Sequence, residues 1–469
     1  MAGPQSEYDP GFAAFGGGTS GSLLHPVTVG ALLIGAVLMF VLPRRYVIVP
    51  MLLGILLIPW PQNLYIAGSH FFVARLFVLF GWARVLFMMA PARRLSDGFN
   101  TVDKFFLIWA LCRAVATTLQ FMALGAVVNQ AGALLDALGG YFVFRRLIRD
   151  DLDVELVVKV FAFAAAIMAV VMIREQMTGQ NLFGLLGGIR TISDTRNGKI
   201  RAQGAFSISI IAGSFGAVSF PLFIWLWKRG KARSLALLGA VSSVLMTFAS
   251  ASSTPISALL AGVLAIFLWP IRRQMRLIRW GIVAGLVALQ IVMKAPVWYV
   301  LSRIDFVGGS SGWERANLID QFVRHTSDWL LIGTHNNANW GWDMWDAANQ
   351  FVAEGEAGGL IVLICFIALI ACCFRLVGKA GRAAQGDRSR EWQFWLLGVA
   401  MFTQVMVYMG IDYFDQSKYF WYLLLVILVV ATKPVLDKLP KQEEKAAATE
   451  WGWDFSAHPL PSEVTADRY

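Results

Sequence analysis

Apolar runs long enough to cross a lipid bilayer recur along almost the whole chain, and they limit the folds open to it. A membrane-spanning α-helix needs about 20 consecutive, mostly apolar residues. Thirteen runs can be placed, the second shorter than the rest, near residues 26–43, 46–60, 71–90, 102–122, 125–144, 155–174, 206–227, 234–250, 254–271, 280–297, 357–374, 392–411 and 417–433. Because transmembrane barrels show short alternating strands instead, the sequence predicts an all-α polytopic membrane protein with about 12–13 transmembrane helices.

Composition agrees with this class of protein. Of the 469 residues, 57% are hydrophobic and only 15% are charged, whereas about 25% are charged in soluble domains. The net charge of +10 does not indicate nucleic acid binding, because most basic residues flank apolar runs. The four cysteines fall inside predicted spans, so neither a disulfide framework nor a zinc site is indicated.

We expect a single transmembrane domain over residues 26–433. Residues 1–25 are rich in Gly and Ser and are predicted to be a flexible segment. Residues 434–469 are predicted to be a polar cytoplasmic tail. No Lys or Arg precedes Arg44, so the basic start of a signal peptide is missing.

Basic residues gather at every second connection between the predicted spans. These groups lie at 44–45, 93–94, 145–149, 228–233, 272–279, 375–382 and from 433 onward. Since Lys and Arg concentrate in cytoplasmic loops, the N-terminus is predicted outside and the C-terminus inside. Two long connections, 175–205 and 298–358, are then extracytoplasmic. Miscounting one weak span would reverse only the N-terminal orientation.

The 298–358 connection is the one long polar interruption of the chain. Connections longer than about 15 residues are usually functional or disordered, and this one is too aromatic for a disordered segment. We therefore expect a folded loop that carries the chemistry.

Both outer connections carry arginine on the side where few cations are expected. The planar guanidinium group suits bidentate contact with phosphate, which indicates a site for a lipid-linked diphosphate. The candidate diphosphate-binding residues are Arg190, Arg201, Arg315 and Arg324. A helix from about Gly312 would carry Arg315. The alternative is solvated loop charge with acidic neighbours, such as Asp194 for the first loop and Glu314 for Arg315.

Two residues of the long connection are candidates for a general base. His335 is one, because histidine is the commonest general base, and Asp346 competes with it; a surface histidine is the alternative. Tryptophan stacks on sugar faces but is also enriched at membrane interfaces, and both interpretations stay open. The candidate glycan-binding residues are Trp313, Trp340, Trp342, Trp345, Asn349 and Glu354.

Within the spans, charged side chains are expensive and usually paired. We expect an ion pair between Arg113 and Asp136. The segment SASSTP at 250–255 would place hydroxyl groups near the site or make a tight turn. No metal or nucleotide motif is present.

Three segments resemble the O-antigen ligase and O-antigen polymerase superfamily of bacterial envelope glycosyltransferases. They are RAQGAFSISIIAGSFG from Arg201, the S-x-S-x-x-P junction at 250–255, and WERANLIDQF followed by LLIGTH and NQFVAEGEAGGL. The resemblance covers about residues 180–375 and, more loosely, the whole topology.

This resemblance implies a fold like that of the membrane C-type glycosyltransferases. It implies transfer of a glycan from undecaprenyl diphosphate to an acceptor saccharide, outside the bacterial inner membrane and with no metal or cofactor. Arg201 and Arg315 match the arginines that would hold the diphosphate. Ligases carry a His-Asn pair where this chain has Ala348-Asn349, which favours an exopolysaccharide or O-antigen polymerase, or a relative that uses His335 or Asp346.

The expected partners are the lipid-linked glycan, the acceptor and the bilayer, with other polysaccharide assembly proteins as further candidates. Two other hypotheses remain: a transporter or flippase for a lipid-linked saccharide, and a non-catalytic component of an assembly complex. A transporter predicts a continuous polar path through the membrane, and the sequence shows few charges at mid-membrane.

Overall fold

The computed structural model describes residues 21–66, 69–88, 99–230, 232–303, 312–341 and 347–437. Within them the chain is a bundle of α-helices with two short hairpins. The helices that occupy the predicted apolar runs are α2 (Pro26–Val41), α3 (Ile48–Leu57), α4 (Val73–Met88), α5 (Thr101–Phe121), α6 (Leu124–Leu134), α7 (Gly140–Leu147), α8 (Asp151–Thr178), α9 (Ser209–Arg229), α10 (Arg233–Ala249), α11 (Ser253–Phe267), α12 (Met275–Val292), α15 (Gln350–Ala383), α16 (Arg388–Tyr408) and α17 (Ser417–Leu436).

The connections hold the remaining elements. The strands are β1 (Asn63–Ile66) with β2 (Ser69–Phe72), and β3 (Thr195–Arg196) with β4 (Lys199–Ile200), both pairs antiparallel. The short helices are η1 (Arg44–Tyr46), η3 (Leu182–Leu186), η4 (Trp269–Gln274), η5 (Val297–Arg303), α13 (Gly312–Arg324), α14 (Thr326–Trp329) and η6 (Ala338–Trp340). A π-helical turn, η2 (Leu135–Gly139), joins α6 to α7.

The structure confirms an all-α, membrane-embedded protein. Every predicted apolar run contains a helix. Among the described residues, six helices are long and apolar enough to cross a membrane, and α2, α10 and α11 are shorter apolar helices. With its 10 residues, α3 spans only about 15 Å, half of a hydrocarbon core of about 30 Å. The number of crossings therefore stays a prediction.

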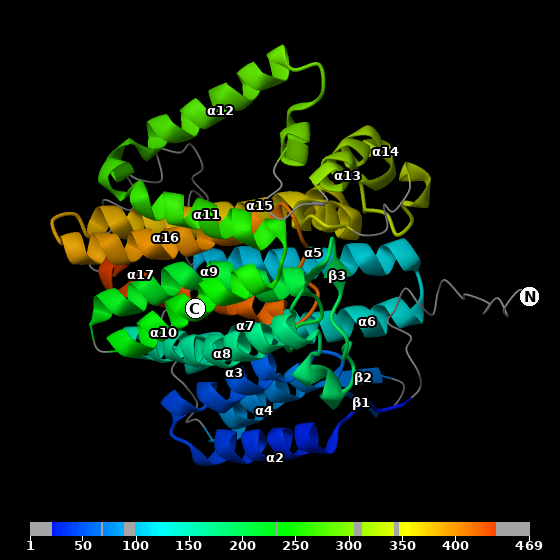
Figure 1. Cartoon of the computed structure of the whole chain (residues 1–469), viewed down its shortest axis with the longest axis vertical. Helices are drawn as coiled ribbons and strands as arrows, with labels where there is room; N and C mark the ends of the chain where they lie inside the picture. The colour runs from blue at the N-terminus through cyan, green and yellow to red at the C-terminus, as the bar shows by residue number, and fades with distance from the viewer. Residues whose placement is uncertain are drawn as a thin grey trace, which may run out of the picture.

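The helices lie roughly parallel to one another, with α2 at one edge of the view and α12 at the other (Figure 1). Helix α17 is buried along nearly its whole length, as expected for a helix that is apolar on all sides. By contrast, α12 has no buried residue and stands apart from the bundle in Figure 1. An apolar helix exposed in this way suits contact with lipid.

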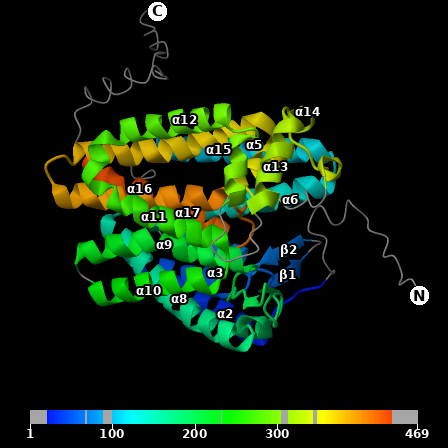
Figure 2. The same ribbon diagram turned by 45° about the horizontal axis from the view of Figure 1, so that its top comes forward.

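One end of the bundle carries the hairpins and the helices of the long connection. Figure 1 shows α13, α14, the β1–β2 hairpin and β3 at the same end, and α13, α14 and β1–β2 again share one end in the turned view of Figure 2. The long connection is folded in its described part, around a small core of Leu318, Phe322, Trp329, Trp340 and Val352. This part of the loop prediction is confirmed.

The expected ion pair between Arg113 and Asp136 is wrong. Arg113 NH1 lies 2.6 Å from Glu354 Oε1, and Asp136 pairs with Arg75 at 2.7 Å. Tyr419 Oη also donates to Asp136 at 3.0 Å. Both charges are paired, as expected because an unpaired charge inside a membrane is energetically expensive. Helix packing, however, gives them other partners than the expected ones.

The predicted flexible segment and the polar tail fall largely outside the described residues, which begin at residue 21 and end at residue 437.

Candidate functional site

Glu175 organises the connection that carries Arg201. It lies in the last turn of α8 and is fully buried. Its carboxylate accepts hydrogen bonds from Ser193 Oγ at 2.7 Å and from the N–H groups of Gln203 and Gly204 at 3.1 and 2.9 Å. Hydrogen bonds to a carboxylate are stronger than those between neutral groups. The segment from Arg201 to residue 208 is therefore held firmly at the end of the bundle.

The guanidinium group of Arg201 has a buried donor that makes no hydrogen bond to the described residues. Its Nε is buried and has no hydrogen-bond partner among the described residues. Burial, and then the charge of Arg196, lowers the pKa of Arg201, while Asp194 acts in the opposite direction. Buried polar atoms are nearly always hydrogen-bonded, so an orphaned guanidinium donor indicates a site that an anion would complete.

The turn between α10 and α11 lies against the Arg201 segment. The N–H of Ala202 donates to the carbonyl of Ala249 at 3.1 Å. From the other side α9 approaches closely, because a Cβ on Gly213 would lie 2.9 Å from the Cβ of Pro255. Within the turn, Ala251 has a φ of 43°, a strained value for a residue with a side chain. Residues 250–252 thus form a tight turn, which was one of the two expectations for this segment, and residues 253–255 begin α11.

Arg315 reaches the loop over residues 409–416, which connects α16 to α17. Helix α13 carries Arg315, as predicted. Arg315 Nε donates to the carbonyl of Gly410 at 3.1 Å. Gly410 in turn packs on Thr254, whose Oγ1 would lie only 2.6 Å from a Cβ at this glycine. Arg315 is therefore joined through Gly410 to the same α10–α11 turn that touches the Arg201 segment.

The 409–416 loop also binds the Arg201 segment directly. Asp415 Oδ2 accepts from the N–H of Ser207 at 3.0 Å, and Gln416 Nε2 donates to the carbonyl of Ala205 at 2.9 Å. Three separate parts of the sequence therefore meet on this loop: residues 201–208, residues 250–255 and α13.

Asn349 is a structural residue at the same place. It is buried, and its Oδ1 caps α15 by accepting from Phe351 N–H at 2.9 Å and Val352 N–H at 3.3 Å. Its Nδ2 donates to the carbonyl of Met409 at 3.3 Å. The side chain thus ties the start of α15 to the 409–416 loop, and it has no exposed surface for the predicted glycan contact.

Glu354 and Trp340 are also held inside the protein. Glu354 is fully buried and accepts from Arg113 at 2.6 Å, Gln350 at 2.7 Å and Trp109 at 2.9 Å. Trp340 is 3% exposed and donates through Nε1 to Asp328 at 3.0 Å. In this structure neither side chain is accessible to a glycan.

Four other candidates lie at the surface. Arg190 is 72% exposed and pairs with Asp194 four residues later. Arg324 is 65% exposed and pairs with Asp320 at 2.6 Å. The side chains of His335 and Trp313 are exposed as well. The solvated-charge alternative therefore describes the two arginines better than an anion-binding role.

Asp346, Trp342 and Trp345 lie outside the described residues, so their roles stay predictions.

An open cavity of about 580 Å³ lies beside the Arg201 segment. Polar residues, among them Gln176 and Lys199, line one part of it, and apolar residues of α10 and α11, including Phe248 and Leu260, line another. Phe248 is 54% exposed and Leu260 46% exposed. The cavity therefore joins a polar end of the bundle to its apolar outer surface.

Sequence reasoning missed Glu175 and the 409–416 loop. A signal for each was present: Glu175 is an acidic residue at the end of an apolar run, and GIDYFDQSK is a polar interruption between the last two runs. Among the residues that the structure describes, no three His, Cys, Asp or Glu side chains gather in a way that would hold a metal ion.

No family model matches this chain, and no curated protein matches it.

Proposed function

We propose that this protein is an inverting membrane glycosyltransferase that polymerises or ligates undecaprenyl-diphosphate-linked oligosaccharides. It would act at the outer face of the bacterial inner membrane, without a metal, in exopolysaccharide or O-antigen synthesis. The observation that carries this proposal is the buried, unpartnered Nε of Arg201, at a point where the Arg315 helix is linked to the same turn. An O-antigen polymerase is favoured over a ligase because Ala348 replaces the ligase histidine.

The proposed reaction needs charge neutralisation rather than covalent catalysis. A hydroxyl oxygen of the acceptor saccharide attacks the anomeric carbon of the donor glycan. The bond from that carbon to the diphosphate oxygen breaks, and undecaprenyl diphosphate leaves with the electron pair. Arg201 and Arg315 would stabilise the charge that develops on the leaving group. His335 or Asp346 would accept the proton of the attacking hydroxyl.

The cavity beside Arg201 suits the lipid part of such a donor. Its apolar wall, with Phe248 and Leu260, is open to the surface that faces lipid, while Lys199 lies in its polar part. A polyprenyl chain could remain in the membrane along this wall with its diphosphate at the level of Arg201. On the glycan side, Trp313 has a side chain exposed for stacking, at 60%.

The test uses Arg201→Gln and Arg315→Gln, with Arg174→Gln as the matched control. Arg174 lies one residue before Glu175, and its NH1 bonds the carbonyl of Gln180, so its loss removes one nearby cation outside the proposed site. Each site variant should lower transfer about 100-fold, as removal of a preorganised charge donor typically does, whereas the control should stay close to wild type. Polymer length in cells and transfer by purified protein from a defined lipid-linked substrate are the measurements.

Normal polymer from both site variants, at normal protein levels, would refute the proposed site. Movement of the lipid-linked glycan across reconstituted vesicles without any change in its length would instead identify a transporter.

A further inference from the structure

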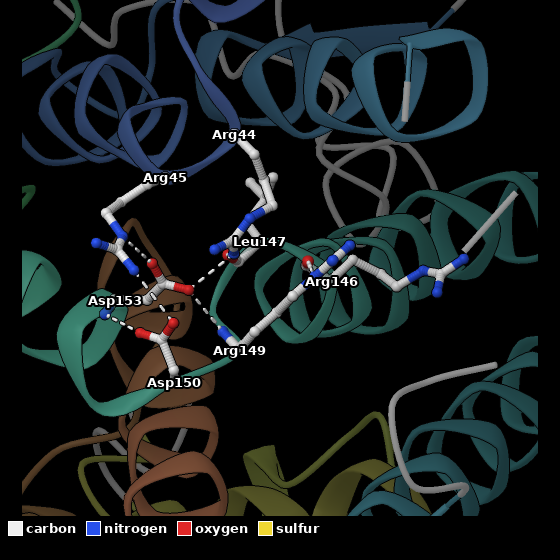
Figure 3. A network of polar contacts seen from close by, with 7 residues as sticks. All are labelled: Arg44, Arg45, Arg146, Leu147, Arg149, Asp150 and Asp153. Carbon is white, nitrogen blue, oxygen red and sulfur yellow. Dashed lines mark hydrogen bonds and ion pairs between the residues drawn. The ribbon is translucent and has the colours of Figure 1, made fainter. Parts of the chain in front are cut away.

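A second group of arginines lies at the other end of α8, around the buried carboxylate of Asp153 (Figure 3). Arg44 NH1 lies 2.7 Å from Asp153 Oδ2 and Arg45 Nε 2.9 Å from Oδ1. Arg45 also reaches Asp150 at 3.2 Å, and the N–H of Arg149 donates to Asp153 at 3.0 Å. Asp153 itself is 1% exposed. These contacts tie the α2–α3 turn to the α7–α8 turn.

The cluster contains more arginines than the two that form ion pairs between these turns. Arg146 and Arg149 add two guanidinium groups, and no described carboxylate forms an ion pair with either of them. Arg149 Nε donates only to the carbonyl of Arg146, at 3.1 Å, as Figure 3 shows. Burial, and then the charges of Arg44 and Arg146, lowers the pKa of Arg149. Four guanidinium groups against two carboxylates leave about two unbalanced positive charges.

The position of this cluster matches that of lipid headgroups. Helix α8 has 28 residues and a length of about 42 Å, so its two ends lie beyond opposite sides of a core of about 30 Å. Asp153 is in its first turn and Glu175 in its last. The cluster therefore lies at the membrane face opposite to Arg201. An apolar stripe of α2, formed by Ile34, Val37 and Val41, is at least 60% exposed just before Arg44.

We propose that Arg146 and Arg149 bind the phosphate of an anionic phospholipid headgroup, with its acyl chains along the exposed stripe of α2. Basic pockets between the ends of transmembrane helices recognise such headgroups. Arg44, Arg45 and Asp153 form the fixed part of the site, because both arginines are already engaged with that carboxylate. This inference does not depend on the glycosyltransferase proposal.

The variant R146Q/R149Q tests the site. Neither side chain holds a carboxylate, so the helix ties through Arg44 and Arg45 should survive the change. The control is R276Q/R279Q, which removes two arginines of the same spacing from the start of α12. Each of the two guanidinium groups that contact the bound headgroup contributes roughly fivefold in affinity, whereas Arg276 and Arg279 are outside this site. We expect R146Q/R149Q to bind phosphatidylglycerol about thirtyfold more weakly, and the control to bind it as wild type does.

Native mass spectrometry of protein from nanodiscs counts bound phosphatidylglycerol, and thermal unfolding compares phosphatidylglycerol with phosphatidylcholine nanodiscs. A phosphatidylglycerol-dependent rise in Tm that is lost only in R146Q/R149Q supports the proposal. Equal binding by this variant and wild type overturns it. A rise of the same size produced by inorganic phosphate in phosphatidylcholine nanodiscs also overturns it, since the site would then take free phosphate.

Discussion

At the scale of single residues, a buried carboxyl group at the Arg201 end of the bundle holds loops in place. Asp415 is fully buried and binds the Arg201 segment through Ser207. Burial raises the pKa of Asp415, although backbone N–H groups of Ser417 and Ser207 oppose the shift. The folded protein therefore prefers the protonated carboxyl more than the unfolded chain does.

This preference predicts a pH dependence of stability. A carboxyl whose pKa is raised on folding contributes stability that is complete below its unfolded value of about 3.9 and is lost as pH rises through the folded pKa. The Tm of wild type, relative to Asp415→Asn, should therefore fall as pH increases above about 4. Thermal unfolding of both proteins in detergent across the acid range measures the difference. Parallel curves for the two proteins would contradict the prediction.

At the scale of elements, α9 can pack closely against the α10–α11 turn because Gly213 has no side chain. The helix lies against Ser250 and Pro255 so closely that a Cβ at this glycine would overlap both. Close helix approach at small residues is the usual means of packing in membranes. The α10–α11 turn, and with it the Arg201 segment, depends on this contact.

Gly213→Val should therefore destabilise the protein by about 1–3 kcal/mol, as overpacking of a close contact does. The matched control is Gly281→Val in α12, where a Cβ meets nothing within 4 Å and where valine improves helix propensity by a few tenths of a kcal/mol. Unfolding in nanodiscs should separate the two variants. Equal stability of the two variants would contradict the prediction, since α9 could then shift to accommodate the valine side chain at position 213.

At the scale of the whole molecule, ion pairs inside the bundle link helices that are far apart in sequence. Arg113 of α5 pairs with Glu354 of α15, 241 residues away. Arg75 of α4 pairs with Asp136, within the π-helical turn η2. Arg75 and Asp136 are both largely buried, and removing one partner of a buried pair leaves an uncompensated charge, which costs about 3–5 kcal/mol. Arg113 is partly exposed, so water screens its pair with Glu354 and the loss of one partner costs less there.

A double-mutant cycle distinguishes these partners from the pair expected from sequence. Arg113→Gln with Glu354→Gln should show a coupling energy of about 1–3 kcal/mol, whereas Arg113→Gln with Asp136→Asn should be additive within about 0.5 kcal/mol. Reversible unfolding of the single and double variants gives both values. Strong coupling between Arg113 and Asp136 would contradict the observed packing.

The positions of the helices could be predicted from the sequence, because the length and hydropathy of a run are local properties. The helix that carries Arg315 was equally local, and it was predicted correctly. The candidate site was predicted only in part. Arg201 and Arg315 were selected by residue type and position, yet Arg190 and Arg324 satisfied the same criteria and lie exposed in ion pairs.

The sequence by itself determined that the protein is helical and lies in a membrane, because no other fold satisfies the backbone of so many apolar runs in lipid. Only the tertiary structure decided which charges meet. Pairing of Arg113 with Glu354 and contact of Arg315 with Gly410 arise from helix packing, and packing joins residues according to shape rather than sequence distance. The tertiary structure also decided which of the candidate arginines are buried. It buries Arg201 Nε without a hydrogen-bond partner, and it leaves the side chain of Arg190 exposed to solvent.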